Sequence, residues 1–126
     1  MNKPLEPIKI TDTAESREYT LEFNRRTVSK TEQAGFDLSK AESAPMTMVY
    51  LLFWGAFLMH HPHMTQEQTN KILDTEFGGV VGLSEITNED GVTMLEYLGK
   101  LYGVPFGAHI DEENGANPPR KMTVKF

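Results

Sequence analysis

Three histidines lie close together in the run His60-His61-Pro62-His63. Imidazole is a common ligand of zinc, copper and nickel, so this run is where the sequence could most readily support metal chemistry. A metal site needs ligands that converge, however, and adjacent residues such as His60 and His61 point in different directions on a helix. The alternative is a polar helix end, where imidazoles lie favourably beside the last carbonyl groups. We favour the helix end and predict no metal site.

Other motifs typical of catalysis are missing from the sequence. It has no Gly-rich phosphate loop with a Lys, no dinucleotide-binding fingerprint and no His-Glu-x-x-His pair. Gly82 stands two residues before Ser84, as in a nucleophile elbow, but the second glycine of that motif is absent. Because the chain has no cysteine, thiolate catalysis, disulfides and Cys-ligated zinc are excluded. We therefore expect a protein that is not an enzyme and uses no cofactor.

Charges are distributed unevenly along the 126 residues, whose formal net charge is −6. Residues 66–110 carry two basic groups against seven acidic ones, a balance that would repel a phosphate backbone. Arg25, Arg26 and Lys30 form a basic cluster, and three charges on a short helix are usually a solvated face. We expect no binding to nucleic acid. The N-terminus has no apolar stretch typical of a secretory signal, so we expect a cytoplasmic protein.

The segment 44–59 is strongly apolar and contains no charged residue. A helix built from it would be apolar nearly all round and must therefore be covered. At about 1.5 Å per residue it would be roughly 24 Å long, which is short of a membrane span. Two interpretations stay open: a helix of the chain's own core, or a helix shared with another copy or a client protein. Flexible methionines suit both roles, and four lie in or beside the segment: Met46, Met48, Met59 and Met64.

The residues before this segment predict a β-hairpin and a polar helix. Apolar and polar residues alternate over 8–11 and again over 19–23, which is typical of two short strands. Asn24 is the expected N-cap of a helix over 25–34, which Gly35 ends.

The connection to the central helix contains two apolar residues, Phe36 and Leu38, which we expect to pin it to the core. The central helix should then start near Ser43, with Pro45 in its first turn. Pro62 predicts its end, because proline disfavours helical geometry at the preceding residue.

Two further helices are predicted after the histidines. The run 65–68 is a capping box and indicates a helix that ends near Glu76. Residues 80–86 are apolar and short, and they fit a helical turn or a strand equally well. Thr87 is the expected N-cap of the last helix, which has an acidic first turn and ends at Gly103.

These elements predict an α+β fold, with an N-terminal β-hairpin followed by a mainly α-helical bundle around a central apolar helix. We expect residues 1–110 to form a single domain, because a chain of this length supports one modest core. Residues 111–126 are polar and rich in Asn, Pro and charged groups, so we expect a flexible C-terminal tail.

Three runs of the sequence carry a resemblance to a known family: LEFNRRTVSKTEQAGF (21–36), APMTM (44–48) and LFWGAF (52–57). Together with the pattern of hairpin, polar helix, apolar helix and two further helices over residues 18–102, these runs resemble the small tail assembly chaperones of long-tailed phages and prophages.

This resemblance implies a chaperone that binds the tape measure protein, keeps it soluble and helps recruit tail tube subunits. It also implies self-association, because many copies must coat a long client, and a location in the host cytoplasm but not in the mature virion. The acidic half of the chain, from Glu67 to Glu96, would keep the complex soluble or bind a basic client. The residues expected to contact a partner are apolar members of the central segment: Met46, Met48, Phe53, Trp54, Phe57 and Met59.

Two alternatives come from other classes of protein. One is a structural virion component, such as a tail-completion or connector subunit, which would persist in purified particles. The other is a small metal-dependent enzyme that uses His60, His61 or His63.

Overall fold

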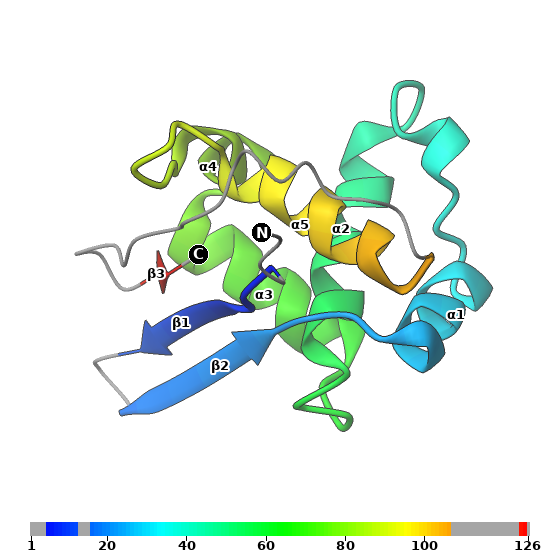
Figure 1. Cartoon of the computed structure of the whole chain (residues 1–126), viewed down its shortest axis with the longest axis horizontal. Coiled ribbons are helices and arrows are strands. Elements are labelled where there is room, and N and C mark those ends of the chain that lie inside the picture. Colours follow the sequence, from blue (N-terminus) through cyan, green and yellow to red (C-terminus); the bar gives the residue numbers. More distant parts are fainter. Residues whose placement is uncertain (1–4, 13–15, 107–123, 126) are drawn as a thin grey trace, which may run out of the picture.

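The computed structural model of the chain describes residues 5–12, 16–106 and 124–125. It confirms the predicted α+β fold, with an N-terminal hairpin followed by helices packed around an apolar helix (Figure 1). The strands are β1 (Ile8–Asp12), β2 (Arg17–Leu21) and β3 (Val124–Lys125). The α-helices are α1 (Arg25–Gln33), α2 (Pro45–Phe57), α3 (Gln66–Phe77), α4 (Val80–Glu85) and α5 (Met94–Gly103). Two short 3₁₀ helices follow α1 and α5: η1 (Leu38–Lys40) and η2 (Val104–Phe106).

The strands of the hairpin pair antiparallel, with Ile8 opposite Leu21 and Ile10 opposite Tyr19. Ile8, Ile10 and Leu21 are buried, so the apolar face of the hairpin packs on the helices. β3 pairs with the other edge of β1, which gives the strand order β2-β1-β3. The two residues of β3 belong to the predicted flexible tail, 111–126, and the rest of that tail lies outside the described residues.

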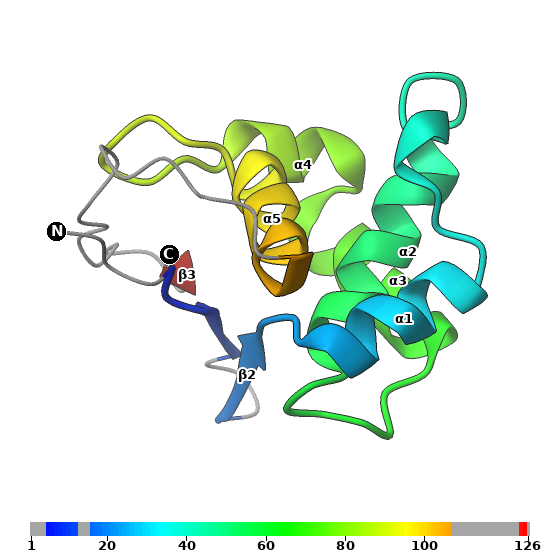
Figure 2. The same cartoon turned by 45° about the vertical axis from the view of Figure 1, so that its right-hand side comes forward.

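α2 lies in the middle of the helical part and is covered on several sides (Figures 1 and 2). It contacts α1, α3, α4, α5, η1 and β2. Pro45 occupies its first turn, as predicted, and Phe53 and Phe57 are fully buried. Among the described helices, none is both long and apolar enough to span a bilayer.

Gly55 allows α1 to lie directly against α2. A Cβ atom at this position would lie 2.0 Å from Oγ1 of Thr31, so only glycine leaves room for the threonine. Thr31 is fully buried, and its hydroxyl donates a 2.7 Å hydrogen bond to the backbone oxygen of Thr27. The polar group that α1 brings into the core is therefore satisfied within α1 itself.

Most predicted helix ends are confirmed. Asn24 caps α1 and Thr65 caps α3, each as part of a capping box. Gly78 ends α3 with a φ of 74°, in the left-handed region that glycine tolerates. Residues 80–86, for which the sequence left helix and strand open, form the helix α4 followed by Ile86 in an extended conformation.

The predicted start of the last helix at Thr87 is wrong. Its N-cap is Thr93, which forms a capping box with Glu96. The residues between form a loop around the buried Asn88, whose side-chain oxygen accepts hydrogen bonds of 2.9 and 3.0 Å from two backbone N–H groups further along. Gly91 has a φ of 81° in this loop. Bonds from an Asn side chain to nearby backbone compete with helix formation, so the helix begins only after the loop closes.

We expect Gly55→Ala to lower the free energy of unfolding by about 1–3 kcal/mol, because the added methyl group overpacks the contact with Thr31. Gly99→Ala is the matched control, since no atom lies within 4 Å of a Cβ at this position in α5. Alanine there should raise the same free energy by up to about 1 kcal/mol through its helix propensity. Urea unfolding followed by circular dichroism measures both changes, and equal effects would contradict the close approach of α1 to α2.

Candidate protein-binding site

The structure divides the six residues predicted to contact a partner between the core and the surface. Three are buried in the core: Met48, Phe53 and Phe57. Trp54 is half-buried, and its indole Nε1–H donates a 3.1 Å hydrogen bond to the backbone oxygen of Met64. Met46 is 64% exposed and Met59 is 36% exposed, and they lie at opposite ends of α2. The six residues therefore do not form one continuous surface.

A groove opens beside Met46, where three helices meet. The end of α1 contributes Ala34, and α3 contributes Gln66 and Asn70. The rest of its lining comes from the first half of α2: Met46, Thr47, Tyr50 and Leu51. We call this surface the Met46 groove. Its lining includes no Asp, Glu, Lys or Arg, so it presents apolar groups together with neutral hydrogen-bonding groups.

One titratable group lines the Met46 groove, the hydroxyl of Tyr50. It donates a hydrogen bond to the carboxylate of Asp74 and so connects α2 to α3. This hydrogen bond and, to a smaller degree, burial raise the pKa of Tyr50 above its ordinary value. The phenol therefore stays protonated at neutral pH, and the groove offers a partner an uncharged surface of apolar and neutral polar groups.

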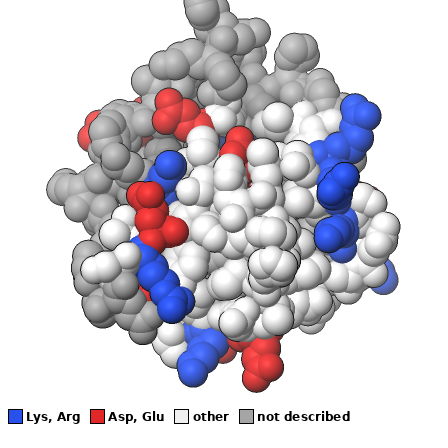
Figure 3. Space-filling model, turned by 90° about the horizontal axis from the view of Figure 1, so that it is seen from below, with Lys and Arg blue, Asp and Glu red and all other residues white. Residues whose placement is uncertain are grey.

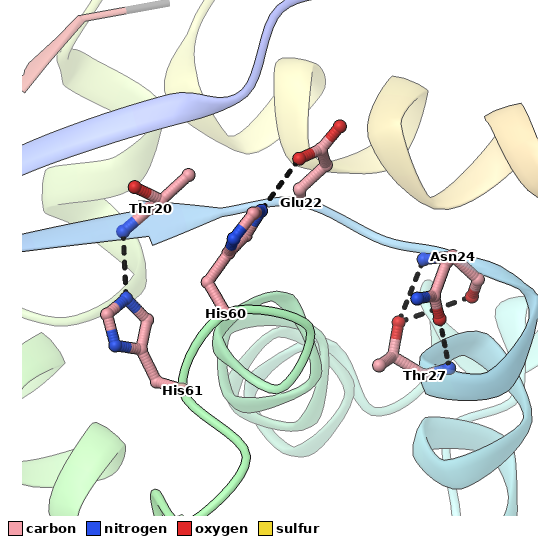
Figure 4. A network of polar contacts seen from close by, with 6 residues as sticks. All are labelled: Thr20, Glu22, Asn24, Thr27, His60 and His61. Atoms are coloured by element: carbon pink, nitrogen blue, oxygen red, sulfur yellow. Dashed lines mark hydrogen bonds and ion pairs between the residues drawn. The ribbon is translucent and has the colours of Figure 1, made fainter.

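Histidines at the other end of α2 attach this end to the edge strand β2 (Figure 4). The Nε2 atom of His61 accepts a 3.0 Å hydrogen bond from the backbone N–H of Thr20, and Nε2 of His60 lies 2.8 Å from Oε1 of Glu22. The backbone N–H of Glu22 also donates to the oxygen of Ala56, at 2.9 Å. These contacts cover part of a strand edge that would otherwise offer unpaired backbone groups to another chain.

The two adjacent histidines turn toward different partners, as the sequence predicts (Figure 4), and His63 is exposed. Across residues 5–12, 16–106 and 124–125, no three His, Asp or Glu side chains gather closely enough to hold a metal ion. Burial and, to a smaller degree, the neighbouring His60 lower the pKa of His61. Its ring is therefore neutral at pH 7, and the ring proton lies on Nδ1 because Nε2 accepts the bond from Thr20.

An uncharged surface lies on the side of the molecule that carries the loop between α2 and α3. No Asp, Glu, Lys or Arg occurs from Ser43 to Gln66. Figure 3, which views the molecule from below, shows a broad central area without charged side chains, with basic groups along the right-hand edge and both basic and acidic groups along the left and lower edges. Each end of α2 thus carries an exposed methionine in an uncharged part of the chain, Met46 at the start and Met59 just after the helix.

A second groove has no counterpart in the sequence analysis. Leu38, which was expected to pin the connection to the core, is 64% exposed and lines this groove with Tyr102, Glu32 and Asp37. Burial and a 2.8 Å hydrogen bond to Glu32 raise the pKa of Tyr102, and hydrogen bonds from Ser39 lower the pKa of Asp37. Because carboxylates line this groove, the Met46 groove suits an apolar partner better. An isolated exposed leucine produces no periodic pattern, which is why sequence reasoning missed it.

We expect the free energy of unfolding to fall as the pH decreases below 6.5, the ordinary pKa of histidine. The folded state lowers the pKa of His61, so the unfolded chain binds more protons in this range and acid favours unfolding. His61→Gln should weaken this pH dependence, whereas His63→Gln, which changes an exposed histidine of the same loop, should leave it intact. Thermal unfolding at about pH 5.5 and about pH 7.5 measures the effect. Equal behaviour of the two variants would contradict the role of His61.

Comparison with known proteins gives one match. A family model described as "Domain of unknown function (DUF5055)" matches residues 1–126. No curated protein and no solved structure matches the chain.

Proposed function

We propose that the chain, which belongs to the DUF5055 family, is a non-enzymatic tail assembly chaperone of a long-tailed phage or prophage. Its client is the tape measure protein, which it keeps soluble in the host cytoplasm, and it helps recruit tail tube subunits before leaving the assembled particle. Support comes from the resemblance of residues 21–36, 44–48 and 52–57 to such chaperones. The observation that carries most weight is the uncharged Met46 groove between α1, α2 and α3.

The Met46 groove has the chemistry that an amphipathic helix needs from a binding surface. Amphipathic helices bind by placing an apolar face in an apolar groove, and a tape measure protein is expected to be long and helical. Met46 has an unbranched, flexible side chain that can adapt to different apolar residues along such a client. Gln66 and Asn70 can donate and accept hydrogen bonds at the border of the groove without fixing one client sequence.

Three features of the packed helices hold the groove in place independently of a client. Leu51 is buried below the groove, and Tyr50 is tied to α3 through Asp74. The end of α1 is held close to α2 by the contact between Gly55 and Thr31. A surface built on packed helices in this way loses little conformational entropy when it binds, which favours affinity.

We expect Met46→Glu to reduce the amount of soluble client by about tenfold, because a carboxylate in the groove would have to be desolvated against an apolar helix. The measurement is co-expression with the tape measure protein encoded in the same genome, followed by quantification of the client in the soluble fraction. Val81→Glu is the matched control, since Val81 is 62% exposed on α4 and does not line the groove. It should leave the soluble client unchanged.

Two results would count against this function. A client that is equally soluble with and without the chain would remove the chaperone role. Mass spectrometry that finds the chain at stoichiometric amounts in purified virions would favour the alternative of a structural virion component. Loss of soluble client with both glutamate variants would instead show that binding does not depend on the Met46 groove.

A further inference from the structure

The outer face of α1 is basic. Arg25, Arg26 and Lys30 are exposed there, and together with Ser29 and Gln33 they line a shallow groove along the helix. The opposite side of α1 carries the buried residues Thr27, Val28 and Thr31, so the basic side chains face outward while the helix is anchored to the core.

None of these three cations forms an ion pair with a carboxylate of the described residues. The same holds for Lys9, Lys40, Lys71 and Lys100, so what distinguishes α1 is that three cations gather on one face. The acidic residue of α1 itself, Glu32, accepts a hydrogen bond from the hydroxyl of Tyr102. The positive charge on the outer face of α1 is therefore available to a partner.

Helix stability does not explain where these arginines lie. Arg25 and Arg26 are the first two residues of α1, and its first turn contains no acidic residue. The N-terminus of a helix carries the positive end of the helix dipole, so positive side chains there are unfavourable. A local arrangement that opposes folding is typical of a surface retained for binding.

The basic face and the Met46 groove are lined by neighbouring residues at the end of α1. Gln33 lines the groove along α1, and the next residue, Ala34, lines the Met46 groove. A partner helix that reaches from one to the other would pass from a basic surface to an uncharged one that offers apolar side chains, such as Met46, beside neutral polar groups. The partner that complements both has carboxylates on one stretch and apolar side chains on the adjoining stretch.

We infer that the outer face of α1 binds the carboxylates of an acidic helical segment whose apolar residues enter the Met46 groove. This rests on the proposed function, because it specifies which segments of a helical client the chain selects. A nucleic acid is a weaker candidate, since the neighbouring Met46 groove offers no positive charge and residues 66–110 carry an acidic excess.

Two labelled synthetic peptides of about 20 residues test the charge preference, each with the same leucine stripe and with either Glu or Lys at the flanking positions. Fluorescence anisotropy with the full chain should show the Glu peptide binding about tenfold more tightly at about 50 mM salt. The preference should shrink at about 300 mM salt, because exposed charge pairs are screened. Equal binding of the two peptides, or binding of neither, would overturn the inference.

The triple variant Arg25→Gln, Arg26→Gln, Lys30→Gln should lose the preference, with about tenfold weaker binding of the Glu peptide. It should fold normally and unfold at the same or a slightly higher temperature, because it removes positive charge from the first turn. The charge-matched control is Lys40→Gln, Lys71→Gln, Lys100→Gln, which changes the net charge equally at sites outside α1. An equal loss of binding in the control would overturn the inference in favour of a net-charge effect.

A single-stranded oligonucleotide that binds the chain more tightly than the Glu peptide, and loses binding in the α1 variant, would also overturn the inference in favour of a nucleic acid.

Failure of this inference can be told apart from failure of the proposed function. If the tape measure protein is kept soluble but the two peptides bind equally, only the charge preference is wrong. If the Glu peptide binds through α1 but the tape measure protein is unaffected, the chaperone role is wrong and the acidic-helix site remains.

Discussion

The burial of α2 is the constraint on which the rest of the structure depends. A helix with apolar side chains on nearly every side and no charge is stable in water only when other elements cover it. α1, α3, α5 and the hairpin supply that cover, and the aromatic rings of Phe53 and Phe57 meet edge to face within it, with centroids 5.1 Å apart. Burying one such side chain contributes about 2 kcal/mol, so a few of them match the net stability of a typical domain.

The cover over α2 leaves mainly its first half and its far end accessible to other molecules. The start of the helix opens into the Met46 groove, because α1 ends and α3 begins beside it. The far end is attached to β2 through His60, His61 and the backbone oxygen of Ala56, which protects a strand edge from unwanted pairing. The histidine cluster thus has a structural explanation in the contacts between the loop and the hairpin, and the exposed methionine at the start of α2 lies where a partner can reach it.

Charge divides the surface of the protein into regions with different chemistry. The outer face of α1 is basic, the lining of the Met46 groove is uncharged, and the acidic excess lies in residues 66–110. In the proposed chaperone, this division would separate the surface that binds the client from the surface that keeps the complex soluble. The groove beside the basic face would select client segments, and the acidic helices elsewhere would repel other complexes and limit precipitation.

The sequence by itself determined the elements whose signals are local. Alternation predicted the hairpin, Asn24 and Thr65 predicted two helix starts, and Gly35 predicted an end, because each acts through its own backbone or its near neighbours. The start of α5 was mispredicted although its signals are also local, because Thr93 and Glu96 form a capping box and Asn88 binds the backbone two and four residues further on. Only the tertiary structure decided which residues of α2 are exposed. A helix that is apolar all round has no distinguishable face, so the packing of α1, α3 and α5 sets which side chains reach the surface.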